Sequence, residues 1–465
     1  MNKKSVAPAL NFQRALIEKY SANGPRYTSY PTALNFFDNF GADAYAQLLG
    51  AEKNTDAPLS LYVHIPFCEN ICYYCACNKI VTPNKLNARQ YLDYLEKEMR
   101  MQSALIGNKR PVTQLHWGGG TPTFLSAAEM TELMCSIAGN FKLLDSIERE
   151  YSIEIDPRTV TGETLALLKG LGFNRLSFGV QDFDYGVQRA VNRVQSFAQV
   201  ENLIHEAREL GFDAIGVDLI YGLPLQSIKS LNQTLQKTLA LAPNRIAFYN
   251  YAHLPQQFSS QRAIDRLALP SAHKKLVMLE LANTVLSAAG YLNIGMDHFV
   301  RADDSLALAQ KRGTLQRNFQ GYSTALAPDL IGMGVSAIGS TEQGYAQNEK
   351  TLADYYRRLD QNQLPIARGL RLTADDQLRR FVIMQIICNL HLDIRAVEIK
   401  FAICFAEYFS DEREQLELLA ADGLLTESAN YITVTSSGRF LLRTICMVFD
   451  RYLSPVFNRS YSQVI

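Results

Sequence analysis

Seven short segments rich in β-branched and aromatic residues alternate with longer amphipathic segments between residues 59 and 296. This alternation predicts βαβ units, in which helices connect the parallel strands of one sheet. The predicted strands cover residues 61–67, 113–117, 151–155, 175–180, 215–221, 245–251 and 291–296. The clearest predicted helices cover residues 88–105, 161–172, 196–210 and 271–290. The pattern therefore predicts an α/β fold, a full or partial parallel (β/α) barrel of six or seven units.

The segments on either side of this repeat have a different character. Residues 1–50 show no helical or strand period, so we expect an irregular N-terminal segment. Residues 51–365 would form the barrel domain, and residues 366–465 a mostly helical C-terminal domain. Within the latter, residues 422–449 predict a hairpin that turns near Ala429 and Asn430, followed by a helix, a pattern that resembles a small winged helix. A helical cap on the barrel is favoured over DNA binding, because 46 basic and 46 acidic residues cancel.

Charge and hydropathy argue against several classes of protein. A net charge of zero does not favour a nucleic-acid or membrane-surface partner. No apolar run reaches the roughly 18 residues of a membrane span, and the first residues lack the apolar stretch of a secretory signal. We therefore expect a cytoplasmic monomer with no nucleic-acid or membrane partner.

Polar or glycine-rich residues lie in the last part of every predicted strand or directly after it. In parallel barrels the reacting groups lie on the loops after the strands, so these residues predict an active site at one end of the barrel. In chain order they are the cysteines of 68–77, the glycines of 118–120, Glu154 with Asp156, Gln181 with Asp182, Asp218 with Tyr221, His253, and Asp297 with His298.

The cysteines supply the most specific motif. Four of the eight, at 68, 72, 75 and 77, have the spacing C-x3-C-x2-C-x-C. Cys68, Cys72 and Cys75 could share one iron–sulfur cluster, and three thiolates on a four-iron cluster leave one iron open to another ligand. A zinc knuckle is the alternative, but zinc usually takes two well-separated ligand pairs and the sequence has no second pair. The remaining cysteines, at 135, 388, 404 and 446, are expected in the core.

Gly118, Gly119 and Gly120 follow a predicted strand and precede a helix. Without side chains, they would let a ligand approach the backbone closely. A simple turn is the alternative interpretation, and the position one barrel unit after the cysteine loop favours the ligand.

Taken together, these motifs resemble a known family. HIPFCENICYYC (64–75) resembles the cluster loop of the radical S-adenosylmethionine superfamily. Further segments resemble, in the same order, the bacterial oxygen-independent coproporphyrinogen III oxidases (dehydrogenases) of haem biosynthesis. They are GPRYTSYPTA (24–33), SLYVHIPFC (60–68), QLHWGGGTPT (114–123), GVQDF (179–183), DLIYGLP (218–224), NYAHLP (250–255), GMDHF (295–299), RNFQGY (317–322), GMGVSAI (332–338) and SQVI (462–465).

The resemblance implies a reaction and its cofactors. Two propionates of coproporphyrinogen III lose carbon dioxide and become vinyls, giving protoporphyrinogen IX. A reduced [4Fe–4S] cluster cleaves S-adenosylmethionine to methionine and a 5′-deoxyadenosyl radical, which removes a hydrogen from the propionate β-carbon. The family binds two S-adenosylmethionine molecules, and an unidentified electron donor and acceptor complete the set of partners. The protein orients these groups and keeps out water and oxygen.

The resemblance also implies roles for individual residues. Cys68, Cys72 and Cys75 match the cluster ligands, and Cys77 matches a further family cysteine, a catalytic candidate together with Tyr62. Ala76 replaces the glycine expected between the last two cysteines. Positions that bind S-adenosylmethionine in the family match Tyr62, Tyr74, Gly119, Gly120, Thr121, Glu154, Gln181, Arg193, Asp218, Ala252 and Ile338.

Alternatives remain for some of these residues. Glu154 could cap a turn and Arg193 could be a surface residue. The four histidines at 64, 116, 253 and 298 could be core residues or belong to the site. Basic residues should meet the four carboxylates of the substrate. The candidates are Arg26, Arg301, Lys311, Arg312 and Arg317.

Two other functions are weighed against the oxidase. A related haem chaperone binds haem without dehydrogenase activity, but Cys77 and the segment 24–32 favour the dehydrogenase. A DNA-binding regulator is disfavoured by the neutral charge. We also expect residues 1–50 to close over the mouth of the barrel, with Arg26 at a propionate, because a carbon radical must be shielded from solvent.

Overall fold

The computed structural model describes residues 12–20, 22–51, 56–107, 109–324 and 327–453. The predicted family match at 462–465 and the first part of the N-terminal segment, residues 1–11, lie outside these ranges.

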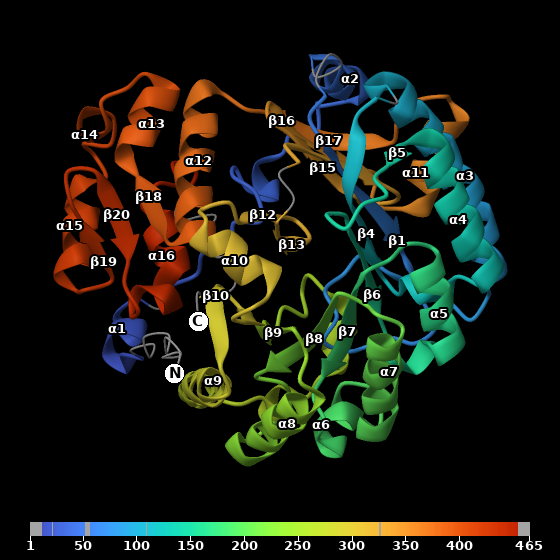
Figure 1. Cartoon of the computed structure of the whole chain (residues 1–465), viewed down its shortest axis with the longest axis horizontal. Coiled ribbons are helices and arrows are strands. Elements are labelled where there is room, and N and C mark those ends of the chain that lie inside the picture. Colours follow the sequence, from blue (N-terminus) through green and yellow to red (C-terminus); the bar gives the residue numbers. More distant parts are fainter. Residues whose placement is uncertain (1–11, 21, 52–55, 108, 325–326, 454–465) are drawn as a thin grey trace.

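A 13-stranded sheet forms the body of the molecule (Figure 1). Six of its strands pair in parallel in succession and confirm the first six predicted strands. They are β1 (Leu59–Ile65), β4 (Pro111–Gly119), β6 (Glu150–Ile155), β7 (Arg175–Gln181), β8 (Ala214–Tyr221) and β9 (Arg245–Asn250). The helices on the outer face of this run are α3 (Leu86–Ile106), α4 (Ala127–Asn140), α5 (Gly162–Gly170), α7 (Phe197–Glu209) and α8 (Ile228–Leu241). Over the described residues the strand order has two free ends, β10 and β17, so the barrel is partial.

The seventh predicted segment is a strand, but it does not pair directly with the other parallel strands, because β11 (His298–Arg301) lies between it and β9. β10 (Tyr291–Gly295) pairs antiparallel with β11, and β11 pairs antiparallel with β9. Only two residues join β10 to β11, which allows a hairpin, whereas a parallel pair needs a long crossover. The seventh parallel strand is β14 (Asp329–Met333) beside β1, and the antiparallel β15 (Ile338–Thr341), β16 (Gly344–Asn348) and β17 (Ile366–Arg371) extend that edge.

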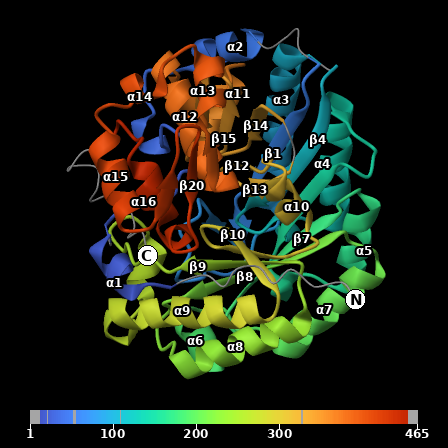
Figure 2. The same cartoon turned by 60° about the vertical axis from the view of Figure 1, so that its left-hand side comes forward.

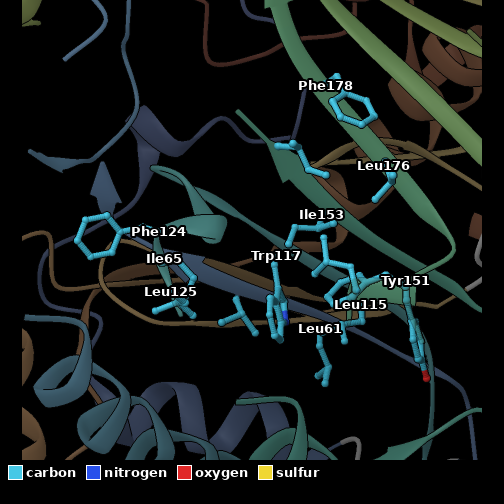
Figure 3. Close-up of a cluster of buried hydrophobic side chains, with 14 of the residues drawn as sticks. Leu61, Ile65, Leu115, Trp117, Phe124, Leu125, Tyr151, Ile153, Leu176 and Phe178 are labelled. Atoms are coloured by element: carbon cyan, nitrogen blue, oxygen red, sulfur yellow. The ribbon is translucent and has the colours of Figure 1, made fainter. Parts of the chain in front are cut away.

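Strand side chains alternate between the two faces of the sheet, and here the two faces differ in chemistry. Leu61, Trp117 and Ile153 lie on the face toward the helices and belong to the main hydrophobic core (Figure 3). Tyr62 is next to Leu61 on β1, and His116 is next to Trp117 on β4. The two residues pair across these strands and face the opposite side of the sheet, which is the inside of the half-barrel. The interior of the barrel is consequently polar, and the core lies outside it.

The C-terminal domain lies beside the β10 edge of the sheet (Figure 2) and has its own hydrophobic core. Its helices are α12 (Ala374–Asn389), α13 (Ile394–Phe401), α14 (Phe405–Tyr408), α15 (Arg413–Ala421) and α16 (Leu442–Met447). A three-stranded sheet joins β18 (His391–Asp393), β20 (Tyr431–Val434) and β19 (Leu425–Glu427). The antiparallel pair β19–β20 turns between residues 427 and 431 and confirms the predicted hairpin.

The expectation that residues 1–50 are irregular is wrong, because the segment contains α1 (Arg14–Lys19) and α2 (Ala42–Ala51). Ile17 packs into the C-terminal core, while Tyr45 and Leu48 pack into the main core. Helices this short owe their stability to such tertiary packing rather than to a long amphipathic pattern.

Between α1 and α2 the chain passes between the barrel and the C-terminal domain. Tyr27 and Tyr30 are 1% and 0% exposed. The Tyr27 hydroxyl donates to Asp450 (2.9 Å), and the Tyr345 hydroxyl donates to the Tyr30 carbonyl (3.0 Å). The segment is therefore anchored to both domains.

Among the described helices, none combines the length and the apolar character that crossing a bilayer would require.

Candidate active site

The cysteine motif lies on the loop that follows β1. Cys68 ends β2 (Phe67–Cys68), which pairs with β3 (Ile80–Val81), so the strand pair closes the base of the loop. The Cys75 amide donates to the Cys72 carbonyl (3.1 Å), which forms a tight turn. Cys68 and Cys72 are buried, whereas Cys77 is exposed and lines a large cavity.

Positive groups and hydrogen-bond donors surround the thiols. The guanidinium groups of Arg193 and Arg158 approach the Cys72 sulfur at 3.4 and 3.6 Å, and Asp156 binds both arginines. The Thr121 hydroxyl donates to the Cys68 sulfur (3.5 Å). Hydrogen-bond donors therefore lie next to two of the three predicted cluster ligands, Cys68 and Cys72.

The pKa values of the cysteines differ with their environments. Burial raises the pKa of Cys68 to about 11, an effect that Thr121 opposes. A hydrogen bond from the Cys77 thiol, together with the nearby charge of Lys79, lowers the pKa of Cys75 to about 6. The Cys77 thiol therefore contacts one of the predicted cluster ligands and also lines the large cavity.

The three predicted ligands fit an iron–sulfur cluster. In the described part of the chain, no group of three His, Cys, Asp or Glu side chains is arranged to hold a single metal ion. A four-iron cluster is wider than one ion, so its ligands need not meet at a point. Three thiols on one loop supply the soft sulfur donors that such a cluster takes. Two arginines lie beside them.

A cavity of about 890 Å³ opens next to the cysteine loop, at the carboxyl ends of β1, β4 and β6. This volume lies in the upper part of the range for small-molecule sites. Five predicted residues line it together: Tyr62, Cys77, Gly119, Glu154 and Ile338.

Tyr62 and His64 form a fixed pair in the wall of this cavity. The His64 Nε2 lies 3.0 Å from the Asn78 carbonyl, which can only accept, so this nitrogen carries the proton. Nδ1 is then an acceptor and receives the Tyr62 hydroxyl at 2.9 Å. Burial lowers the pKa of His64, which keeps the ring neutral.

The glycine loop allows close approaches, as expected for a ligand-binding loop. Gly119 has a φ of +113°, and a Cβ there would lie 2.7 Å from the His64 ring. A Cβ at Gly120 would lie 2.7 Å from the backbone of Pro66 and Phe67. Glycine is therefore required where β4 meets the cysteine loop.

Gly119→Ala is accordingly expected to displace His64 and break its bond to Tyr62. A misplacement of this kind costs about 100-fold in rate in comparable sites, so S-adenosylmethionine cleavage should fall by that order. Gly139→Ala is the matched control, because nothing lies within 4 Å of the added methyl. Equal cleavage rates for the two variants would contradict the assignment.

Glu154 faces the same cavity, and 46% of its side-chain surface is accessible. Its carboxylate accepts from the Gly119 amide (3.2 Å) and from His116 Nε2 (3.3 Å). Burial acts to raise the pKa of Glu154, but the bonds from His116 and Gly119 outweigh it and hold the pKa below its usual value. Glu154 is thus an anion held at the cavity wall, rather than a turn cap.

Asp218 lines a smaller inner chamber of about 160 Å³, which shares His116, Glu154, Tyr249 and Gln320 with the large cavity. The Ser177 hydroxyl donates to its carboxylate (3.2 Å). Burial and the negative charge of Glu154 raise the pKa of Asp218 to about 7.

Asp218→Asn is therefore expected to change how stability depends on pH. A raised pKa in the folded state favours folding at low pH, and this contribution is lost as pH rises from the ordinary value of 3.8 through about 7. The neutral variant avoids that loss, so it should gain stability over the wild type between pH 4 and pH 8. If the free energies of unfolding of the variant and the wild type differed by the same amount at every pH in this range, the raised pKa would be refuted.

Other predicted residues lie outside the large cavity. Arg193 and Thr121 contact the thiols, so the surface-residue interpretation of Arg193 is wrong: it is 7% exposed. Tyr74, Gln181 and Ala252 are not among the residues that line the cavity.

Several polar residues of the half-barrel were not predicted as site residues. Of the four histidines left open, His64 and His116 line the large cavity, His253 bonds to Tyr251 (2.9 Å), and His298 on β11 lines the inner chamber. Burial and the charge of Arg317 lower the pKa of His298 to about 3. The signal for the interior positions was the period-two alternation itself, which places polar residues at alternate positions of β6 and at most of those of β4 and β7. The additional residues are Ser152 on β6, Ser177 on β7 and Tyr249, which faces the same interior from β9.

Comparison with known proteins agrees with this geometry. Residues 62–238 match the model of the radical SAM superfamily, and residues 372–441 match the HemN C-terminal domain. The chain is 48% identical to the oxygen-independent coproporphyrinogen III oxidase of Pseudomonas aeruginosa, over 97% of this chain and 98% of the relative. It is 48% identical to the enzyme of the same name from Escherichia coli, over 98% and 99%.

A solved structure shows the same fold. The coproporphyrinogen III oxidase HemN from Escherichia coli, described as a radical SAM enzyme, superimposes with a TM-score of 0.91 at 47% identity, over 96% of this chain and 100% of that one. Near-complete coverage in both directions extends the likeness to the N-terminal segment and the C-terminal domain as well as the half-barrel. The chain belongs to the family of oxygen-independent coproporphyrinogen III oxidases, within the radical SAM superfamily.

Proposed function

We propose that the protein converts coproporphyrinogen III to protoporphyrinogen IX without oxygen, by decarboxylating two propionates to vinyls. The observation that carries the proposal is the cysteine loop opening directly into the large cavity, in a chain whose relatives carry this activity in their names. The cavity is large and partly polar, which suits an S-adenosylmethionine beside a porphyrinogen.

Cys68, Cys72 and Cys75 would hold the [4Fe–4S] cluster. When bound and reduced, the cluster supplies the electron that cleaves S-adenosylmethionine to methionine and a 5′-deoxyadenosyl radical. Arg193 and Arg158 approach the Cys72 sulfur and would place two guanidinium groups beside the bound cluster.

The remaining residues bind and orient. Glu154 presents a carboxylate to hydroxyl or ammonium donors of S-adenosylmethionine, and Tyr62, held by His64, presents its ring to the same space. Asp218 lines the inner chamber together with Glu154, whereas Glu154 also lines the large cavity. We also propose that two S-adenosylmethionine molecules bind in the site. The further residues that would hold them are Tyr74, Gly120, Thr121, Gln181, Ala252 and Ile338.

We also propose that residues 24–32 cover the substrate. Arg26 is bonded to Asp297 and lies 5.7 Å from the Tyr249 ring, which lines the large cavity. A propionate that meets Arg26 must therefore share it with Asp297. In this proposal residues 1–50 act with the barrel domain of 51–365 and the C-terminal domain of 366–465 around one site.

An anaerobic assay of the reconstituted protein tests the function. Coproporphyrinogen III, S-adenosylmethionine and a one-electron reductant should yield protoporphyrinogen IX, carbon dioxide and 5′-deoxyadenosine. Cleavage of S-adenosylmethionine without carbon dioxide, together with stoichiometric haem binding, would overturn the proposal and favour the chaperone.

A further inference from the structure

The five basic residues considered for the substrate's carboxylates have very different surroundings. Arg301 is 47% exposed and paired with Asp303, and Lys311 and Arg312 are exposed. Arg26 is already paired with Asp297. Arg317 alone among the five combines a position inside the molecule with the lack of an acidic partner among the described residues.

Arg317 lies on the hairpin of β12 (Gln316–Asn318) and β13 (Gly321–Ser323). Its Nε and Nη1 atoms are buried without a hydrogen-bond partner. The guanidinium lies 4.7 Å from the ring of Tyr322, which orients it but satisfies none of its donors. Burying a cation in this state is costly unless an anion completes the site.

The cavity that Arg317 lines has a volume of about 340 Å³, and its wall carries three basic side chains against one acidic side chain, Glu342. The hairpin, residues 28–29 and helices α12 and α13 form its wall, which also carries Arg380 and Lys400. Arg380 donates to the backbone carbonyls of Thr341 and Glu342, and Lys400 lies over the Phe381 ring at 5.2 Å. Within the described residues neither is paired with a carboxylate.

This cationic cavity adjoins the catalytic space. Gln114 lines both the cationic cavity and the inner chamber, and the inner chamber shares Glu154 and Tyr249 with the large cavity. A ligand whose reacting arm lies beside Cys77 could thus extend another arm toward Arg317. The lining residues Thr28 and Ser29 belong to the segment that we propose covers the substrate.

We propose that Arg317, with Arg380 and Lys400 around it, forms a subsite for a carboxylate that does not react, namely one of the two propionates that the product retains. This inference rests on the proposed function and adds a binding residue to it. A guanidinium binds a carboxylate through two parallel hydrogen bonds, which would satisfy the buried donors and fix the rotation of the macrocycle. The choice of propionates to be decarboxylated then follows from which one is held.

Binding of coproporphyrin III, the stable oxidised macrocycle with the same four carboxylates, tests the subsite apart from turnover. The probe is titrated by fluorescence into cluster-loaded protein with S-adenosylmethionine, and its tetramethyl ester serves as the uncharged comparison. Arg317→Gln should weaken binding of the acid by about 30-fold, as expected for removal of one partner of a buried charged pair. Binding of the ester should stay at the wild-type level, which also shows that the variant is folded.

Two further variants complete the test. Arg317→Lys keeps the charge but not the paired donors, so it should bind the acid with intermediate affinity. Arg301→Gln, an exposed arginine, is the matched control and should bind like the wild type. Equal losses for acid and ester, or wild-type affinity in Arg317→Gln, would refute the subsite. If instead the wild type binds both probes but produces no carbon dioxide from coproporphyrinogen III, the proposed function fails while the subsite stands.

Discussion

Replacing Cys68, Cys72 or Cys75 by serine is expected to abolish S-adenosylmethionine cleavage. A serine hydroxyl is a hard, protonated donor at neutral pH and does not replace a soft thiolate on iron. Each variant should lose the brown absorbance of the cluster and at least half of the bound iron and sulfide. The fold should persist, because the loop is closed by β2 and β3 and by the Cys75–Cys72 turn of the backbone.

Cys77→Ser is the informative comparison. Its side chain lines the large cavity, whereas the three predicted ligands lie on the loop beside it. This variant should keep the cluster, measured as iron per protein, while porphyrinogen turnover changes. Full iron in a Cys72→Ser protein, or no iron in Cys77→Ser, would show that the ligand set is assigned incorrectly.

Tyr30→Ala is expected to lower the free energy of unfolding by about 3–5 kcal/mol, the range for removing a large buried aromatic side chain. Tyr30 is 0% exposed, and its hydroxyl accepts from the Arg451 amide (3.2 Å). Loss of the ring should also loosen the segment that we propose as a cover. More 5′-deoxyadenosine should then form per protoporphyrinogen IX.

Tyr30→Phe separates the two effects, because it keeps the ring and removes one hydrogen bond. It should cost about 1 kcal/mol and leave the product ratio near that of the wild type. Denaturant unfolding and the ratio of the two products are the measurements. If Tyr30→Ala is destabilised yet keeps the wild-type ratio, the segment anchors the domains without covering the substrate.

Much of the half-barrel could be predicted because local patterns specify it. The alternation of strands and helices between residues 59 and 250 and the strand-end motifs follow from hydrophobic periodicity. The pairing of β10 with β11 and of β14 with β1 could not be predicted, because it depends on which strands meet in space. Helices α1 and α2 were missed for the same reason. Their few apolar residues form no clear helical period, and they stabilise these helices only by packing into the two hydrophobic cores.

The site divides along similar lines. The cysteines must lie close together to share one cluster, and the glycines must be adjacent to let a ligand approach the backbone. Both groups are therefore visible in the sequence. His64 and His116 looked equally suited to a core, and only the orientation of their strands places them in the cavity wall. Arg317 was one of five equal candidates until its lack of a partner set it apart.

The contact between Tyr27 and Asp450 joins residues 423 positions apart in the chain. Synthesis releases the N-terminus first, and domains generally fold as units in that order. The segment 24–32 therefore has no complete binding surface until the last residues near 450 have left the ribosome. The cysteine loop and its strands emerge long before that moment. During this interval iron and sulfide could reach the cysteine loop before the segment 24–32, which we propose covers the substrate, has a complete surface to pack on.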